Sequence, residues 1–268
     1  MAGRTFAVGD IHGEIGQLLR LLRMLPPLTA ADSLVFVGDY LDRGPASAQV
    51  IGCLRGLQQN SPAKVVCLRG NHEDAWLRVL DQGWDEFVFP PRNGCLATMR
   101  SFLGRPAPTL GDMPNKDEAE GLFAGSFFPS EVVAWLRGLP YFHEDENAIY
   151  VHAGLPEKEG QFLHPRDVPD PIVMLWLRTK RFFEGYRGKP VVVGHTVTED
   201  LPQELSQFTP DDPSDLFAGE AVFGIDTGCG NGGFLTALEL PSRRIYESRS
   251  SQVYSLQKPD GEARALKV

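Results

Sequence analysis

Residues 34–44 read Leu-Val-Phe-Val-Gly-Asp-Tyr-Leu-Asp-Arg-Gly, an apolar run that leads directly into two carboxylates and an arginine. Such a short and continuous apolar run is typical of a strand covered on both faces. Similar runs occupy residues 5–8, 64–68, 148–151, 190–193 and 221–225. Amphipathic segments at 14–25 and 46–58 alternate with the early runs. We therefore expect an α/β fold in layers, with right-handed crossovers.

The rest of the chain departs from this alternation. Glycines and prolines interrupt residues 83–128, which we interpret as an irregular, partly helical insertion or lid in a single domain spanning 1–268. A helix is expected at 130–138, with Ser130 as its cap. Residues 199–219 are expected to form a loop, and the tail 241–268 to add edge strands.

Composition limits the classes of function. The 26 Lys and Arg and 35 Asp and Glu give a net charge of −9, and 42% of the residues are hydrophobic, as in an ordinary globular protein. No basic cluster predicts a nucleic-acid partner, and no apolar run or leader-like N-terminus predicts a membrane or secreted protein. The four cysteines form no CxxC pair, so we expect reduced, mostly buried thiols and a cytoplasmic location.

Polar motifs follow five of the apolar runs at the point where each predicted strand ends. They are Gly9-Asp10-Ile11-His12-Gly13, Gly38-Asp39-Tyr40-Leu41-Asp42-Arg43-Gly44, Arg69-Gly70-Asn71-His72-Glu73, Val151-His152-Ala153-Gly154 and Gly194-His195-Thr196. In open α/β sheets ligands bind at the carboxyl ends of strands. We therefore expect the five motifs to converge on one site.

These motifs predict a site with two metal ions. Any one of them alone fits a capping Asp or a satisfied core His better than a metal ligand, but four of the six histidines follow predicted strands. Asp10 and Asp39 would repel each other at one spot unless cations held them together. We expect Asp39 to bridge two divalent ions, and the other ligands to be Asp10 and His12 on one ion and Asn71, His152 and His195 on the other.

As a set, GDIHG, GDYLDRG, LRGNHE, VHAG and GHT resemble the calcineurin-like metallophosphoesterases. The resemblance is strongest to the bacterial and phage branch of the PPP serine/threonine phosphatases, which is related to the symmetrical diadenosine tetraphosphatases. It implies a four-layer α/β/β/α sandwich with the metal site at strand C-termini. It also implies direct hydrolysis, by a hydroxide bridging two divalent ions, with Mn²⁺ preferred and Fe or Zn²⁺ as alternatives.

The resemblance also implies the remaining site residues. His72 would protonate the leaving oxygen and Asp42 would orient it, while Arg43 would bind phosphate together with Asn71. A second phosphate-binding arginine is expected in the tryptophan-containing segment 175–178, which assigns Arg178, with Arg181 as the substitute.

Other polar and aromatic residues favour structural interpretations. Glu73 and Asp74 open a helix and suit its dipole. Asp226 fits turn chemistry as well as a hydrogen bond to a metal-binding histidine. We expect surface positions for His143 and His164, and core positions for Trp76 and Trp135.

The leading functional hypothesis is a metal-dependent serine/threonine protein phosphatase that acts on a phosphorylated protein or peptide. A symmetrical bis(5'-nucleosyl)-tetraphosphatase, or another phosphoesterase of phosphorylated small molecules, is the alternative, and a non-catalytic binding protein is the remote one. The acidic patch Asp117, Glu118 and Glu120 favours a basic phosphopeptide over a polyanionic dinucleotide.

Overall fold

The computed structural model describes residues 3–208, 212 and 214–256 and contains two main β-sheets. The strands of the first sheet, in spatial order, are β13 (Val253–Ser255), β12 (Arg244–Glu247), β11 (Thr236–Leu240), β1 (Thr5–Val8), β2 (Ser33–Phe36) and β3 (Lys64–Cys67). The strands of the second are β4 (Phe142–Glu144), β5 (Ile149–Val151), β8 (Val191–Val193), β10 (Val222–Gly224) and β9 (Phe217–Ala218). A separate hairpin joins β6 (Glu157–Lys158) to β7 (Gln161–Phe162).

Both sheets have a parallel centre. Strands β1, β2 and β3 run parallel in one sheet, as do β5, β8 and β10 in the other, and the remaining strands pair antiparallel at the flanks. All six predicted strands are therefore confirmed. The tail contributes β12 and β13, as expected, and its residues 257–268 lie outside the described part of the chain.

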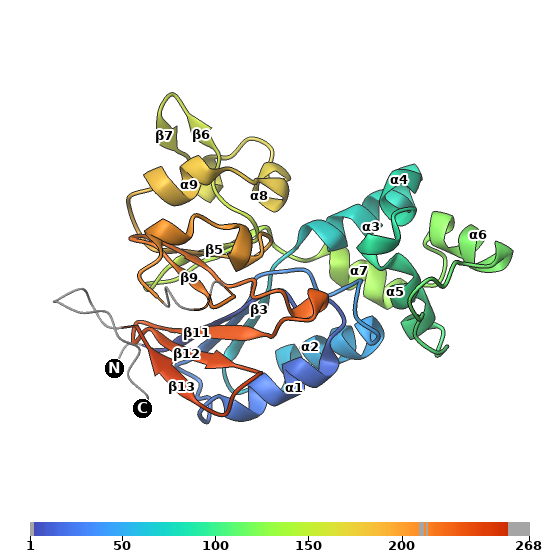
Figure 1. The fold of residues 1–268 in the computed structure, drawn as a ribbon, viewed down its shortest axis with the longest axis horizontal. Coiled ribbons are helices and arrows are strands. Elements are labelled where there is room, and N and C mark those ends of the chain that lie inside the picture. Colours follow the sequence, from blue (N-terminus) through green and yellow to red (C-terminus); the bar gives the residue numbers. More distant parts are fainter. Residues whose placement is uncertain (1–2, 209–211, 213, 257–268) are drawn as a thin grey trace.

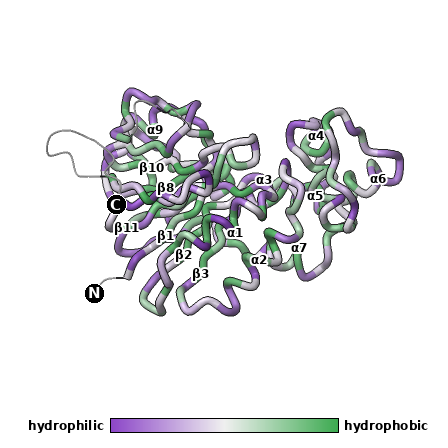
Figure 2. Tube along the Cα trace, turned by 60° about the horizontal axis from the view of Figure 1, so that its bottom comes forward, coloured by the Kyte–Doolittle hydropathy of each residue, from purple (hydrophilic) through white to green (hydrophobic). Residues whose placement is uncertain are grey.

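Alternating side chains show that each central strand is covered on both faces. In β1, Phe6 and Val8 pack into the helix-side core while Ala7 faces the second sheet. In β8, Val192 packs between the sheets while Val191 and Val193 face the helices behind the second sheet. Hydrophobic strands fill the middle of the molecule (Figure 2). This two-sided burial produces the near-continuous apolar runs seen in the sequence.

Helices complete the four layers. Below the first sheet lie α1 (Ile15–Met24) and α2 (Ser47–Asn60), and the second sheet is covered by α8 (Val173–Trp176) and α9 (Lys180–Gly185) (Figure 1). The chain thus adopts the expected α/β/β/α sandwich. None of the helices in the described residues has the length and apolarity needed to cross a membrane.

A group of helices stands to one side of these layers (Figures 1 and 2). It consists of α3 (Asn71–Gln82), α4 (Asp85–Val88), η1 (Pro91–Asn93), α5 (Cys95–Phe102), α6 (Lys116–Ala124) and α7 (Ser130–Arg137). The segment 83–128 is thus more regular than its glycines and prolines indicate. Its buried Phe127 and Phe128 pack on Trp76 of α3, with ring centroids 5.2 Å apart in each pair, so the segment shares the main core.

Several local predictions need correction. Ser130 is the first residue of α7 and caps nothing, because the chain enters the helix through Pro129. The loop 199–219 contains η3 (Thr198–Asp200), η4 (Gln203–Leu205) and β9, and the chain forms two further short helices, η2 (Pro165–Asp167) and η5 (Cys229–Asn231). All four cysteines are free, as expected, and only Cys53 is partly exposed.

The acidic patch predicted in the insertion is largely neutralised. Glu118 is 4% exposed, and its carboxylate accepts hydrogen bonds from Arg100 (3.0 Å) and Arg105 (3.4 Å). Exposed Glu120 lies 3.9 Å from Lys116. The expectation of a free acidic surface is therefore wrong for Glu118, because two arginines of the same segment form ion pairs with its carboxylate and neutralise it.

Candidate metal centre

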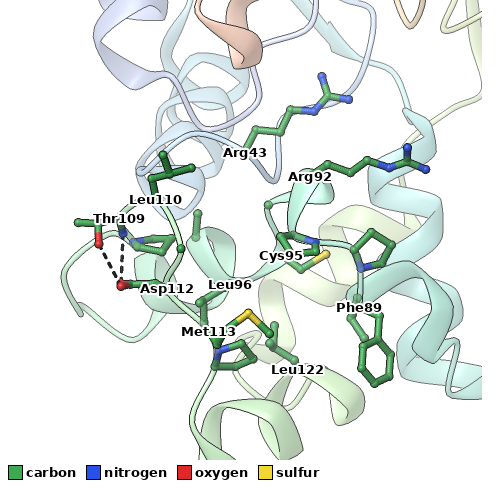
Figure 3. A pocket seen from close by; sticks show the side chains of 18 of the residues that line it. Arg43, Phe89, Arg92, Cys95, Leu96, Thr109, Leu110, Asp112, Met113 and Leu122 are labelled. Atoms are coloured by element: carbon green, nitrogen blue, oxygen red, sulfur yellow. Dashed lines mark hydrogen bonds between the residues drawn. The ribbon is translucent and has the colours of Figure 1, made fainter.

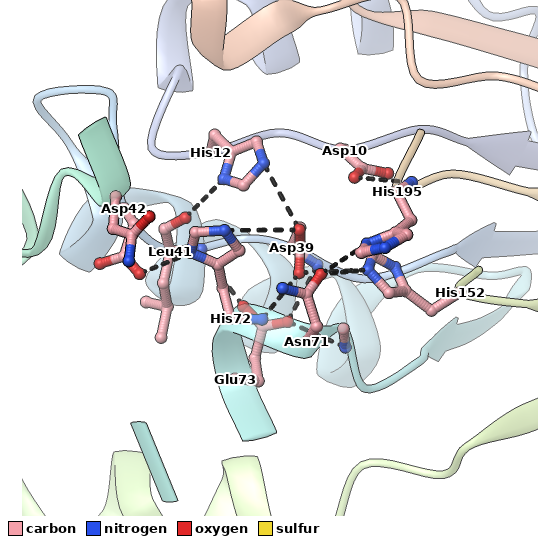
Figure 4. Close-up of polar contacts among 12 residues, drawn as sticks. Asp10, His12, Asp39, Leu41, Asp42, Asn71, His72, Glu73, His152 and His195 are labelled. Atoms are coloured by element: carbon pink, nitrogen blue, oxygen red, sulfur yellow. Dashed lines mark hydrogen bonds and ion pairs between the residues drawn. The ribbon is translucent and has the colours of Figure 1, made fainter. Parts of the chain in front are cut away.

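The polar motifs do converge. The loops after β1, β2 and β3 of the first sheet meet the loops after β5 and β8 of the second (Figure 4). They bring together all six expected ligands, each of them buried: Asp10, His12, Asp39, Asn71, His152 and His195. Parallel strands end at one edge of a sheet, and here two such edges face each other.

Asp39 lies at the middle of this cluster, between the histidines in Figure 4. Its Oδ2 is 3.5 Å from His12 Nε2, and its Oδ1 is 3.4 Å from His152 Nε2. Two overlapping groups able to hold a metal ion share this carboxylate, one with His12 and His72 and the other with His152 and His195. Asp39 thus presents one oxygen to each group, as a carboxylate that bridges two ions would.

Two histidines have their orientations fixed by backbone carbonyls. His12 Nδ1 lies 2.8 Å from the carbonyl of Leu41, and His152 Nδ1 lies 2.9 Å from that of Val37. A carbonyl only accepts, so each Nδ1 carries the proton and donates it. The lone pair on each Nε2 then faces Asp39, as in metal-binding histidines whose other nitrogen is held by a carbonyl.

Asn71 joins the second side of the cluster. Its Oδ1 is 2.9 Å from His152 Nε2 and 2.8 Å from His195 Nδ1. On the first side, Asp10 Oδ2 accepts the backbone N–H of His195 at 3.0 Å. Asp10 belongs to neither of the two compact groups around Asp39, so its role as a ligand stays a prediction.

Unsatisfied polar atoms support cation binding. Asp10 Oδ1, His12 Nε2 and His195 Nε2 are buried and have no hydrogen-bond partner. Buried polar atoms are normally paired, because leaving one unpaired costs about 1–3 kcal/mol. A mixed set of carboxylate, amide and imidazole donors suits Mn²⁺, Fe or Zn²⁺. The residues present therefore fit the divalent ions that the sequence predicts.

The electrostatics point the same way. Burial lowers the pKa of His195 to about 2, with His152 and Arg178 adding to the effect, and burial likewise lowers that of His12. Both rings are therefore neutral, which is the form that binds metal. Burial, together with Asp226 and Asp39, raises the pKa of Asp10 well above its usual range. Cations would relieve this crowding of carboxylates.

The backbone is unusual at the same positions. Of the seven non-glycine residues with positive φ in the described chain, five belong to the predicted site, which are His12, Asp39, Asp42, Arg43 and His195. Such conformations cost energy and cluster at functional sites. Glycine is also required at 194, where a Cβ would overlap the Asp10 carboxylate, and at 70, where it would overlap that of Asp39.

His72 and Asp42 form the expected pair. His72 Nδ1 is 2.7 Å from Asp42 Oδ2, which leaves Nε2 facing the cluster, 3.9 Å from Asp39 Oδ2. Burial lowers the pKa of His72, but the carboxylates of Asp39 and Asp42 outweigh this and raise it overall. Asp42 also accepts hydrogen bonds from Trp76 Nε1 (2.9 Å) and Thr98 Oγ1 (2.7 Å). Trp76 is buried as predicted, but neither of these two contacts is evident from the sequence.

The three candidate arginines differ in their surroundings. Arg43 follows Asp42 directly, and no carboxylate in the described residues forms an ion pair with it. Arg178 donates to the backbone oxygen of His195 at 3.2 Å, which places it beside the cluster. Arg181 is exposed and forms an ion pair with Glu157. This arrangement favours Arg178 over Arg181 as the second phosphate-binding residue.

Glu73 has a larger role than the helix-dipole interpretation allowed. It is fully buried, and its carboxylate accepts the backbone N–H groups of Asp39 (2.9 Å), Tyr40 (2.8 Å), Gly70 (3.0 Å) and Leu41 (3.3 Å). Glu73 therefore holds the Asp39 loop against the start of α3. The helix-dipole interpretation was incomplete, because the sequence did not reveal that these two segments touch.

Replacing Glu73 by glutamine should lower the free energy of unfolding by about 2 kcal/mol, since the new NH₂ group would face backbone donors. The measurement is urea unfolding of metal-stripped protein. Glu120→Gln, at a surface position 69% exposed, is the matched control and should change stability by less than about 0.5 kcal/mol. Equal stability of the two variants would contradict this role for Glu73.

The remaining candidates lie outside the cluster or act structurally. His143 lies in β4, half-buried and stacked on Tyr150 at 5.9 Å, so the surface prediction was wrong for it. His164 lies 3.2 Å from Glu144 and is partly exposed. Asp226 Oδ1 accepts the N–H of Gly228 at 3.0 Å, in agreement with turn chemistry. Trp135 packs against the core at its edge, as expected.

Comparison with known proteins finds a family that matches most of the chain. The model of the calcineurin-like phosphoesterases matches residues 3–222. The symmetrical bis(5'-nucleosyl)-tetraphosphatase of Methylococcus capsulatus is 30% identical over 151 residues, 56% of this chain and 43% of that protein. The enzyme of the same name from Coxiella burnetii is 28% identical over 169 residues, 61% of this chain and 47% of that protein. The chain thus spans less than half the length of these curated relatives.

Solved structures share the fold. The crystal structure of a proposed diadenosine tetraphosphatase superposes with a TM-score of 0.56 at 22% identity, over 92% of this chain and 93% of the other. A cold-active protein-tyrosine phosphatase from a psychrophilic Shewanella gives a TM-score of 0.55 at 19% identity, over 99% of this chain and 81% of the other. At these identities the likeness extends to the fold alone.

Proposed function

This chain belongs to the calcineurin-like phosphoesterases, and from that premise we propose that it is a metal-dependent hydrolase that cleaves dinucleoside tetraphosphates symmetrically. Water would add to one of the two central phosphorus atoms and the central P–O–P bond would break. Diadenosine tetraphosphate would then yield two molecules of ADP. The curated relatives that carry this activity in their names support the proposal over the protein-phosphatase hypothesis.

The observation that carries the proposal is the presence of pockets on two sides of the centre. One, of about 650 Å³, has Arg43 in its wall. Another, of about 540 Å³, is lined by Arg178 and by Thr196, which follows His195. A dinucleoside tetraphosphate carries a nucleoside at each end of its phosphate chain, so it needs room on both sides of the phosphorus that is attacked.

The side chains of the centre would divide the chemistry among them. Asp39 and its neighbours would hold two divalent ions, which would polarise the phosphoryl oxygens and make water more acidic. Arg43 and Arg178 neutralise charge on the phosphate. His72 donates a proton from Nε2 to the leaving oxygen, and Asp42 holds the ring through Nδ1.

Serine/threonine phosphatase activity is the second candidate. It is favoured by the segment Leu175-Trp176-Leu177-Arg178, which resembles the PPP branch and puts Arg178 beside His195. The insertion offers less free negative charge to a basic phosphopeptide than expected, because its own arginines neutralise Glu118.

One assay separates the two candidates. Metal-stripped protein, resupplied with Mn²⁺, is incubated with diadenosine tetraphosphate and a phosphothreonine peptide in one tube, and both products are followed by chromatography. We expect ADP as the sole nucleotide product. Release of phosphate from the peptide with the dinucleotide intact would refute the proposal, as would formation of AMP and ATP.

The identity of the ions and the location of the protein belong to the same proposal. We propose Mn²⁺ as the preferred ion, with Fe or Zn²⁺ as alternatives, because no cysteine joins the described ligand cluster. The free cysteines fit the reducing cytoplasm.

A further inference from the structure

The pocket beside Arg43 has an apolar wall that the centre itself does not need. Figure 3 shows the wall, formed by side chains from 88–97 and from 108–123. Its apolar members include Phe89, Leu96, Leu110, Met113, Leu122 and Phe123. Phe89 is 68% exposed and Leu110 is fully exposed. Large apolar side chains that gather at the surface usually mark a binding site. A volume of about 650 Å³ suits a small-molecule ligand.

The pocket adjoins the leaving-group side of the centre. Gly94 in its wall packs so closely on the backbone of Arg43 that a Cβ would overlap it. Gly230, another wall residue, packs equally closely on the side chain of His12. The ring of Phe87, just before the wall begins, lies 5.5 Å from that of His72. A group released after protonation by His72 would therefore lie at the mouth of this pocket.

The pocket wall also includes two guanidinium groups, and one of them, Arg43, interacts electrostatically with the buried carboxylates of Asp10 and Asp226. Arg92 and Arg43 extend to the same side of the apolar wall in Figure 3. In the described chain, neither forms an ion pair or a side-chain hydrogen bond with a carboxylate. The one acid in the lining, Asp112, is already paired with Arg100 at 3.0 Å. Two guanidinium groups without an ion pair, beside an apolar wall, match a ligand with an anionic end and a flat, weakly polar end.

We infer that this pocket binds one nucleoside diphosphate end of the substrate, with Arg92 on the phosphate next to the sugar and the apolar wall around the base. The inference rests on the proposed function and deepens it by adding Arg92, a residue outside every motif in the sequence. A phosphopeptide would place a single phosphate between the metal centre and Arg43, which leaves Arg92 without an anion. Two phosphates in sequence would offer an anion to each of the two arginines.

The first test compares two substrates in Mn²⁺-loaded protein. Arg92→Ala should lower the ratio of kcat/KM for diadenosine tetraphosphate to kcat/KM for p-nitrophenyl phosphate about tenfold, through a higher KM for the dinucleotide. Arg23→Ala is the matched control, because Arg23 is exposed in the last turn of α1 and does not line this pocket. The control should leave the ratio within about twofold. An unchanged ratio in Arg92→Ala would overturn the inference.

The second test probes the apolar wall. Leu110→Asp puts a negative charge at a fully exposed position in the wall, whereas Leu103→Asp does the same at an exposed position outside it. Neither change buries a charge, so both proteins should fold. We expect the KM for diadenosine tetraphosphate to rise about tenfold in the first variant and to stay within about twofold in the second. Equal effects would overturn the assignment of the wall.

A binding measurement separates failure of this inference from failure of the proposed function. If wild-type protein leaves diadenosine tetraphosphate intact, the proposed function is refuted. Calorimetric titration with ADP then tests separately whether the pocket binds a nucleoside diphosphate. An ADP dissociation constant about tenfold higher in Arg92→Ala than in wild type would support the pocket. Equal dissociation constants, or ADP binding no tighter than pyrophosphate, would show that a different group occupies it, such as an apolar side chain of a peptide.

Discussion

Asparagine in place of Asp39 should reduce hydrolysis of diadenosine tetraphosphate and p-nitrophenyl phosphate alike by about a thousandfold or more. The carboxylate has one oxygen 3.5 Å from His12 Nε2 and the other 3.4 Å from His152 Nε2. Asparagine keeps one oxygen but replaces the second with an NH₂ group, and it removes a negative charge. The variant can therefore no longer hold two cations together.

Metal analysis of the same variant checks the cause of this loss. We expect Asp39→Asn to retain at most one divalent ion per chain after desalting from Mn²⁺. Asp81→Asn is the control, because exposed Asp81 pairs with Arg137 at the surface and lies outside the cluster. Its metal content and activity should match those of wild type. Full metal content with full activity in Asp39→Asn would contradict the bridging role.

Alanine at His72 should lower kcat about a hundredfold on a substrate with a poor leaving group, such as phenyl phosphate, while the protein keeps its metal. His72 Nδ1 is held by Asp42 at 2.7 Å, and the free Nε2 faces the cluster. A ring fixed in this way can give its proton to a departing oxygen. The measurement is steady-state kinetics together with metal analysis.

The size of this effect should depend on the leaving group. p-Nitrophenolate departs without much help from an acid, so His72→Ala should lower its release much less than that of phenol. His164→Ala, which removes a partly exposed ring that pairs with Glu144, should leave both rates near wild type. An equal loss on both phenyl esters would show that His72 acts otherwise, and loss of metal would make it a ligand.

The placement of the site could be predicted from the sequence because it depends on short-range features. Each motif begins where an apolar run ends, and parallel strands deliver their carboxyl ends to the same edge. Asp10, Asp39 and Asn71 follow β1, β2 and β3, so knowledge of the strands alone brings them close together. Because Asp10 and Asp39 would repel each other at one place, their closeness then predicts that the site binds cations.

What the sequence did not reveal depends on contacts between distant segments. Thr98 reaches Asp42 across 56 residues, from an insertion that its glycines and prolines made look irregular. Glu73 binds the backbone of the loop at Asp39 and Tyr40, where no side-chain pattern exists to be recognised. The pairing of Glu118 with Arg100 likewise required the turn between α5 and α6. The sequence of a segment gives the sign of its net charge, but it does not show which of its charged side chains pair with each other.

A titration of metal-stripped protein with Mn²⁺ tests the two-metal centre most directly. Activity on p-nitrophenyl phosphate and bound Mn²⁺ are measured on the same samples. We expect activity to reach its plateau when about two ions are bound per chain, and one ion per chain to support little turnover. Full activity at one bound ion, or activity in protein without divalent metal, would contradict it.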